Sequence, residues 1–304
     1  MEGTIDIIKN AFSDAWKMWK KSGKDFFVDL LKISLLQWAI YGIVTIILVS
    51  AALILMGGAV EGATGMETLS LLTGNIAFVA LAVLLVVASW LVASVLGSVV
   101  FNVVDNRANG KKTEIVKRFK TNFIPVTGYI ALVIVISIII CLPIVLGYLF
   151  TSGASVLSIL GGMCLFGFVS VVFYLLFAFL IQFSMLELVI ERRGVVESLK
   201  SSYALVKKNI VTVLLFDIVY IIIAFGIGSI TSVIERVFIV GIELMAFGGS
   251  IVGAAMGGVL YLLVVFLLTV ASYFILLPIY YFLWRGLGPK KKQEEKKKTK
   301  RKPF

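Results

Sequence analysis

The sequence places one carboxylate well inside a long apolar segment, Asp217. It lies eight residues beyond Asn209 in the run that begins at Ile210, which is about 12 Å along an α-helix. Ionisable groups are costly inside a bilayer, so they are functional candidates by default. Asp217, with Tyr220 one turn further on, therefore predicts a cation or proton site that faces the interior of a helical bundle. The alternative is a protonated or hydrogen-bonded acid that holds two helices together.

Four further polar side chains occupy apolar segments: Gln182, Glu187, Gln37 and Asn102. Gln182 and Glu187 lie near the end of the apolar run that precedes the one with Asp217, and there they could line a vestibule shared with Asp217. Interhelical hydrogen bonds between such groups contribute about 0.6 kcal/mol on average in membranes. A hydrogen bond of this kind is the simpler interpretation for each of the four.

Other chemistry is restricted by what the sequence lacks. It contains no histidine, which excludes Ser-His-Asp hydrolysis and His-ligated zinc chemistry. An intramembrane aspartyl protease would need a second facing aspartate and a GxGD motif, which is absent. Cys141 and Cys164 lie in apolar runs without CxxC spacing and are expected to be small buried side chains. We expect a protein that is not an enzyme, with no catalytic residue, cofactor or metal.

Long apolar runs dominate the chain, of which 60% is apolar and 15% charged. Soluble domains contain roughly 45–50% apolar and about 25% charged residues. A bilayer core of about 30 Å requires roughly 20 apolar residues in a helix, and these runs lack the alternation of a membrane β-barrel. The sequence predicts an all-α integral membrane protein with six transmembrane helices, at about 30–56, 76–101, 123–150, 157–186, 210–230 and 251–283.

Lysine and arginine gather on one side of these segments. They precede the first segment, fill the connections at 107–120 and 192–208, and follow the last segment. The opposite loops carry one basic residue and four glutamates: Arg236, Glu61, Glu67, Glu235 and Glu243. Because basic flanks are retained on the cytoplasmic side, we expect a multipass protein of the cell membrane with both termini cytoplasmic.

The basic segments share a local pattern. At 6–12, 114–119 and 197–203, an acid stands three residues before a lysine, an aromatic residue follows soon after, and a polar stretch then leads into an apolar run. The pattern predicts three parallel repeats, at about 1–106, 107–193 and 194–288, each an interfacial amphipathic helix followed by a transmembrane hairpin. Together they form one transmembrane domain, 1–288, and the lysine-rich run at 289–304 is predicted to be a disordered cytoplasmic tail.

The first basic segment is typical of an amphipathic helix, since apolar residues recur at i, i+3 and i+4 between Ile5 and Trp19. A basic helix at the membrane interface predicts contact with anionic lipid headgroups, although it could also simply pack beneath the bundle. The tail lacks the interleaved aromatic residues that stack on bases, so specific nucleic-acid binding is not expected. The predicted headgroup contacts are Lys9, Trp16, Lys17, Trp19, Lys20, Lys117, Arg118, Lys200, Lys207 and Lys208.

Small residues recur one helical turn apart in two apolar runs. They are Gly249, Gly253 and Gly257 in the last run, and Ser89, Ala93 and Gly97 in the second. Such spacing lets helix backbones approach closely. We expect tight packing within the bundle, with formation of a homo-oligomer as the alternative.

The segment from Glu197 to Asn209, followed directly by the apolar run from Ile210, resembles the membrane-domain-like family named after glycerophosphoryl diester phosphodiesterases. The resemblance implies a multispan bundle, and some members of that family also carry a soluble phosphodiesterase domain. Only a lysine-rich run follows Arg285 in this sequence, so we do not expect phosphodiesterase activity.

These observations favour a non-enzymatic multipass protein whose basic cytoplasmic surface engages lipid, in membrane organisation or as a partner module. The alternative is a transporter or channel for a small solute or ion along the repeat axis, with Asp217 as its ionisable group. A membrane subunit for a separate enzyme is a third interpretation.

Overall fold

The computed structural model describes residues 2–56, 76–151, 156–247 and 251–288. Every secondary-structure element in these ranges is a helix. The predicted lysine-rich tail lies outside the described residues. The helices are α1 (Glu2–Met56), α3 (Ile76–Ala108), α4 (Ile115–Thr151), α5 (Val156–Ile181), α6 (Ser184–Val189), α7 (Val195–Lys208), α8 (Ile210–Phe247) and α9 (Ile251–Leu287).

Six helical segments are long and apolar enough to cross a membrane, which confirms the all-α class and the predicted number of spans. The chain is a multipass membrane protein. Two bounds differ from the sequence prediction. α5 ends at Ile181, where the chain turns before α6, and α8 continues to Phe247, a length of 38 residues. α8 is about 57 Å long, which exceeds the hydrocarbon thickness of a bilayer. The helix continues past the predicted end at residue 230 because each added residue forms one more backbone hydrogen bond.

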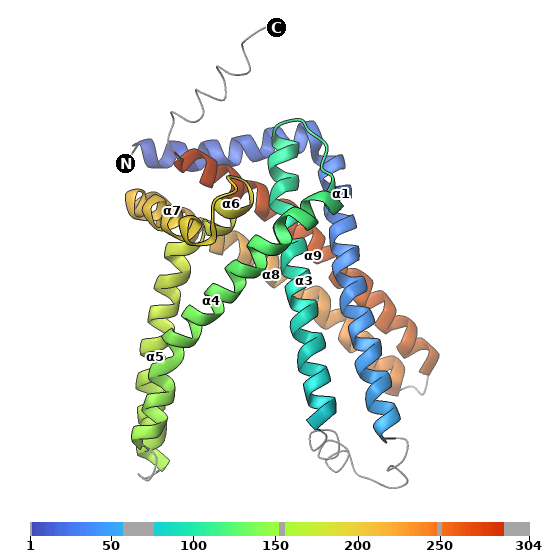
Figure 1. Ribbon diagram of the computed structural model, residues 1–304. Coiled ribbons are helices and arrows are strands. Elements are labelled where there is room, and N and C mark those ends of the chain that lie inside the picture. The colour runs from blue at the N-terminus through green and yellow to red at the C-terminus, as the bar shows by residue number, and fades with distance from the viewer. Residues whose placement is uncertain (1, 57–75, 152–155, 248–250, 289–304) are drawn as a thin grey trace.

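The first amphipathic segment and the first span form one continuous helix of 55 residues, α1. Its N-terminal part crosses the end of the bundle before the helix turns to run beside α3 (Figure 1). Ser22 and Gly23 supply a pair of the type at which long helices bend. The second amphipathic segment is likewise continuous with its span in α4, so only the third, α7, is a separate helix.

The long helices form an open row of three hairpins, α1 with α3, α4 with α5, and α8 with α9. Within the row, α9 packs on α1 and α3 packs on α4. In the described residues α5 packs on α4 and α7, and it makes no comparable contact with α8. The α4 and α5 hairpin diverges from α1 and α3 away from the end that holds the N-terminus (Figure 1).

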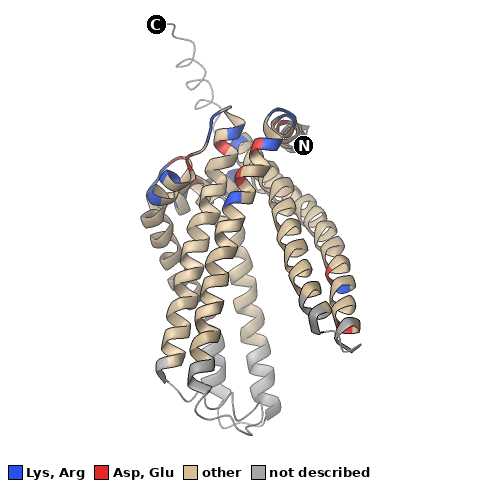
Figure 2. Cartoon of the chain, turned by 90° about the vertical axis from the view of Figure 1, so that its right-hand side faces the viewer, with Lys and Arg blue, Asp and Glu red and all other residues tan. Residues whose placement is uncertain are grey.

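We call that end the basic end; it comprises residues 2–32 of α1, residues 105–120 from the last turn of α3 to the first turns of α4, residues 182–208 and the last turn of α9. Charged side chains gather there, while α8 carries Glu235, Arg236 and Glu243 toward its opposite end (Figure 2). Buried side chains also belong to this half. Among the side chains that the structure describes, buried ones extend no further than Ser34 in α1 and Ile130 in α4, and in α9 they begin at Phe266. The hydrophobic core therefore holds the hairpins together near the basic end.

Candidate functional site

A buried ion pair links the first hairpin to its own amphipathic segment. Arg107, in the last turn of α3, donates from Nη2 to Asp29 Oδ2 at 2.6 Å and from Nε at 2.9 Å. Its Nη1 also lies 3.1 Å from Asp25 Oδ2. The Asp29 side chain is 9% exposed and that of Asp25 is 66% exposed. A bidentate, desolvated pair of this kind restrains the geometry of both helices.

A second pair joins α6 to the chain around it. Glu187 is buried, and its Oε2 lies 3.0 Å from Arg193 Nε. Its Oε1 accepts a hydrogen bond of 3.0 Å from the indole Nε1 of Trp284 in α9. The Arg193 guanidinium also donates to Ser201 Oγ in α7. Glu187 and its partner Arg193 therefore connect α6, α7 and α9. The position of Glu187 in the sequence does not indicate these contacts.

A third contact connects α9 to α3. The Tyr281 hydroxyl donates to Asp105 Oδ1 at 2.7 Å and accepts a 3.4 Å hydrogen bond from Arg285 Nη1. Tyr281 is 1% exposed. Each hairpin thus ends, at the basic end, in an arginine that contacts a buried acid or a buried phenol.

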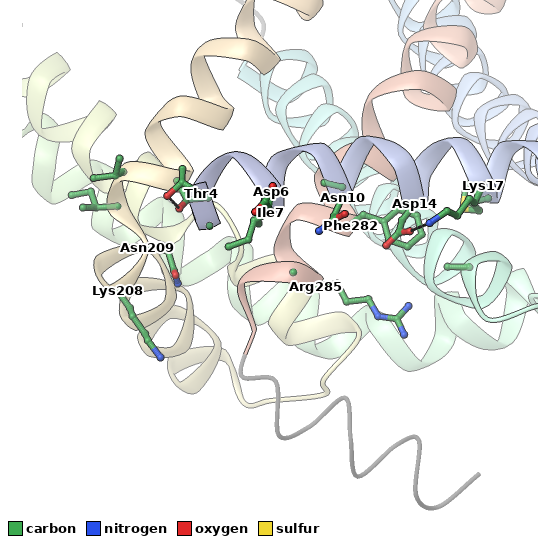
Figure 3. A pocket seen from close by; sticks show the side chains of 18 of the residues that line it. Thr4, Asp6, Ile7, Asn10, Asp14, Lys17, Lys208, Asn209, Phe282 and Arg285 are labelled. Atoms are coloured by element: carbon green, nitrogen blue, oxygen red, sulfur yellow. Dashed lines mark hydrogen bonds and ion pairs between the residues drawn. The ribbon is translucent and has the colours of Figure 1, made fainter. Parts of the chain in front are cut away.

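A groove of about 1080 Å³ opens at the basic end between these elements. Its walls are the polar flank of α1, the end of α3, the junction of α7 and α8, and the end of α9. Figure 3 shows Lys208, Arg285 and Lys17 spaced along it, with Asp6 and Asn10 on the α1 wall. The basic and acidic residues of its lining are Lys17, Lys21, Arg107, Lys208, Arg285, Asp6 and Asp14.

Asp217 is half-buried on α8, and the structure brings several predicted residues to it. The Gln182 amide lies beside its carboxylate, beyond ordinary hydrogen-bond geometry, and Gln182 Nε2 is buried without a hydrogen-bond partner. Tyr220 and Tyr280 complete the cluster, with ring centroids 6.1 Å apart, and the Tyr280 hydroxyl donates to the Gln182 carbonyl. Among the described residues Asp217 forms no ion pair. The cluster and the hydrogen bond between Glu187 and Trp284 both join the second and third hairpins, whose long helices α5 and α8 make no comparable contact in the described residues.

The remaining predicted polar residues lie elsewhere. Gln37 Nε2 donates to the Ala93 carbonyl at 2.9 Å and so links α1 to α3. Asn102 is buried in α3, and its amide donates to the Ser98 carbonyl of the same helix at 3.5 Å. Glu187 is engaged with Arg193 and is not part of the Asp217 cluster.

The small-residue segments lie where helices approach closely. Ser89 and Ala93 are buried on α3, and a Cβ added at Gly97 would lie 3.9 Å from the Gln37 amide of α1. A Cβ added at Gly257 would lie 2.9 Å from Ile242 Cγ1, so α9 packs against α8 at this point. Gly253 lies in α9, and Gly249 lies outside the described residues.

Most of the predicted headgroup contacts are exposed at the basic end. Lys9, Lys17, Lys117, Lys200 and Lys208 are exposed and Arg118 is half-buried. On α1, Lys20 Nζ lies 5.3 Å from the ring centroid of the exposed Trp16. On α7, Lys207 Nζ lies 5.8 Å from the ring centroid of the exposed Tyr203. Trp19 instead packs toward α9, where its indole donates to the Phe274 carbonyl at 3.1 Å.

The sequence analysis missed Asp29, Tyr280 and Tyr281. The sequence contains one indication that Asp29 could have a partner. Asp29 precedes the first apolar run and Arg107 follows the second, so both are expected at the same depth in the membrane. Nothing local marks the two tyrosines, because an aromatic residue near a membrane interface is ordinary.

Comparison of the chain with models of known protein families, with curated proteins and with solved structures yields no match. The resemblance of 197–209 to the membrane-domain-like family therefore stays a prediction, and the functional argument depends on the site alone.

Proposed function

We propose that this chain is a non-enzymatic membrane protein whose basic end faces the cytoplasm and binds anionic lipid headgroups, in membrane organisation or as a partner module. One observation carries the proposal. α1 and α7 each expose an aromatic ring with a lysine four residues further on placed over it, Trp16 with Lys20 and Tyr203 with Lys207. An amphipathic aromatic ring suits the headgroup level, and a neighbouring lysine suits an anionic phosphate.

The wider charge distribution supports the same proposal. Polybasic segments at a membrane surface gain about 1 kcal/mol per lysine or arginine from anionic lipid. The basic residues of α1, α4 and α7 share one end of the molecule (Figure 2). Our proposal of three repeats is supported by the arginine that follows each hairpin, although the contacts differ: Arg107 pairs with Asp29 of α1, Arg193 pairs with Glu187, and Arg285 donates to Tyr281 of its own helix.

The test measures lipid preference directly. Spin-labelled phosphatidylglycerol and phosphatidylcholine are compared in vesicles that contain the full chain, by the fraction of lipid immobilised at the protein. We expect phosphatidylglycerol to be preferred, with the preference falling as salt screens the charges. Lys20→Ala with Lys207→Ala should weaken the preference, and Lys20→Arg with Lys207→Arg should retain it. Equal association of the two lipids, or an alanine variant with unchanged preference, would contradict the proposal.

The orientation has its own test. After both native cysteines are replaced by serine, a cysteine at Lys112 should react with a membrane-impermeant maleimide only when the cytoplasmic face is exposed. Reaction from the opposite side in intact cells would reverse the proposed topology.

A transporter or channel is a second candidate, favoured by the Asp217 cluster. Its carboxylate lies beside a neutral amide and phenols rather than a described cation, an arrangement that could exchange a proton or a small cation. Asp217 lines neither the groove nor a smaller pocket on α8. Ion flux in vesicles that vanishes in Asp217→Asn while lipid preference is retained would establish transport in place of the first proposal.

A further inference from the structure

The groove at the basic end has the size of a ligand site. Small-molecule pockets commonly measure roughly 300–1,000 Å³, and this groove is about 1080 Å³. Four separate elements form it, so its shape depends on the assembled bundle rather than on one helix. The lipid-facing pairs Trp16 with Lys20 and Tyr203 with Lys207 do not line it.

Its charge favours an anion. Five basic and two acidic side chains line the groove. Asp14 is neutralised by Lys17 at 2.9 Å, and Arg107 is held by Asp25 and Asp29. Lys21 from α1, Lys208 from α7 and Arg285 from α9 are the other basic residues of the lining, and Asp6 is its other acidic residue.

The spacing of these cations favours a ligand with more than one negative group. Lys208 lies toward one side of the groove, and Arg285 lies between it and Lys17 (Figure 3). The α1 wall adds Asn10, whose amide can donate to an oxyanion. The lysine-rich sequence that follows α9 carries the same sign of charge as the lining, which makes it an unsuitable occupant.

We propose that this groove binds a phosphate-bearing molecule, through Lys21, Lys208 and Arg285. Lysine and arginine both recognise phosphate oxygens by charge-assisted hydrogen bonds. The phosphate can belong to a water-soluble ester or diphosphate, or to a phospholipid headgroup that reaches the groove from the neighbouring bilayer. The proposal does not depend on the two aromatic–lysine pairs that carry the lipid proposal, because neither Lys20 nor Lys207 lines the groove.

Adjacent lysines provide a matched pair of variants. Lys21 and Lys208 line the groove, while their neighbours Lys20 and Lys207 lie over aromatic rings outside it. Lys21→Ala with Lys208→Ala therefore removes the same charge, from the same two helices, as Lys20→Ala with Lys207→Ala. A diffuse effect of net charge would weaken binding equally in the two double variants.

The experiment titrates inorganic pyrophosphate into the full chain held in phosphatidylcholine nanodiscs, with binding measured by calorimetry. We expect saturable binding that weakens about tenfold in Lys21→Ala with Lys208→Ala and changes little in Lys20→Ala with Lys207→Ala. The same titration is repeated in nanodiscs that contain phosphatidylglycerol, to distinguish a lipid headgroup from a soluble phosphate. If phosphatidylglycerol competes with pyrophosphate, a headgroup is the occupant. If the affinity for pyrophosphate is unchanged, a soluble phosphate is the occupant. Absence of saturable binding in phosphatidylcholine, or equal loss in both double variants, overturns the proposal.

Discussion

The two halves of the molecule are built on different physical principles. In the half nearest the basic end, buried side chains of α1, α3, α6, α7, α8 and α9 form the main core. Val126 and Ile130 of α4 form a second, smaller cluster with α3 and α6. Buried ion pairs hold Asp29 and Glu187 in the same half. In the other half the described side chains of α4 and α5 are mostly exposed and apolar, and the hairpins diverge (Figure 1). Lipid chains are as apolar as these side chains, so no hydrophobic force drives the helices together there.

This difference separates the parts that hold the fold from those that face lipid. Asp217 lies near the boundary, since Phe216 is the last buried residue of α8. The two buried acids on the basic side of that boundary, Asp29 and Glu187, are paired with arginine, whereas Asp217 has only neutral neighbours described around it. Variants in each half should therefore differ in cost, and the loss of charge at Asp217 should cost less than the loss of charge at a paired acid.

The largest expected effect is at the Arg107 pair. Arg107→Ala leaves Asp29 buried without its partner, and such a loss costs about 3 kcal/mol. Asp25→Ala should cost less than about 1 kcal/mol, because Asp25 is exposed and its pairing is screened. The free energy of unfolding by SDS titration in detergent measures both. Arg107→Met combined with Asp29→Leu should recover most of the loss, and comparable losses in Arg107→Ala and Asp25→Ala would show that the pair does not anchor this half.

A smaller effect is expected at the contact between α8 and α9 in the other half. Gly257→Leu forces a side chain against Ile242, whose Cγ1 already lies 2.9 Å from an added Cβ. Overpacking of this kind costs about 1–3 kcal/mol. Gly258→Leu is the control, because nothing lies within 4 Å of a Cβ added there. Equal stability of the two variants, measured by the same titration, would mean that α8 and α9 separate freely in this half.

The hydrogen bond between α1 and α3 should contribute less again. Gln37→Leu removes the donor to the Ala93 carbonyl and should lower the free energy of unfolding by about 0.6 kcal/mol. Thr45→Val is the matched control, since the Thr45 hydroxyl donates to the Tyr41 carbonyl within its own helix. A loss in Gln37→Leu that is no greater than in Thr45→Val would remove Gln37 from the contacts that link the first hairpin.

The sequence predicted the helices well, because apolar runs longer than a bilayer crossing leave few alternatives. It also suggested that Gln182 and Glu187 could line a vestibule shared with Asp217 and Tyr220. Gln182 does lie beside Asp217, whereas Glu187 pairs with Arg193. It could not predict the partner of Asp29, which is 78 residues away in Arg107. An acid in an amphipathic segment looks solvent-exposed until the packing of α1 across α3 is known. The sequence could not predict the groove for the same reason, because its four walls come from distant parts of the chain.

The smallest effect on stability is expected for Asp217→Asn. Asparagine keeps the size of the side chain and an oxygen that faces Gln182, and no described cation loses a partner. We expect the free energy of unfolding to change by less than the roughly 0.6 kcal/mol of an average interhelical hydrogen bond. Asp29→Asn should cost more, because it removes the charge that Arg107 binds. If Asp217→Asn proves as costly as Asp29→Asn, then Asp217 is a structural acid that closes the row of hairpins. A small cost would leave its carboxylate free for exchange with a proton or cation, which keeps transport testable by flux.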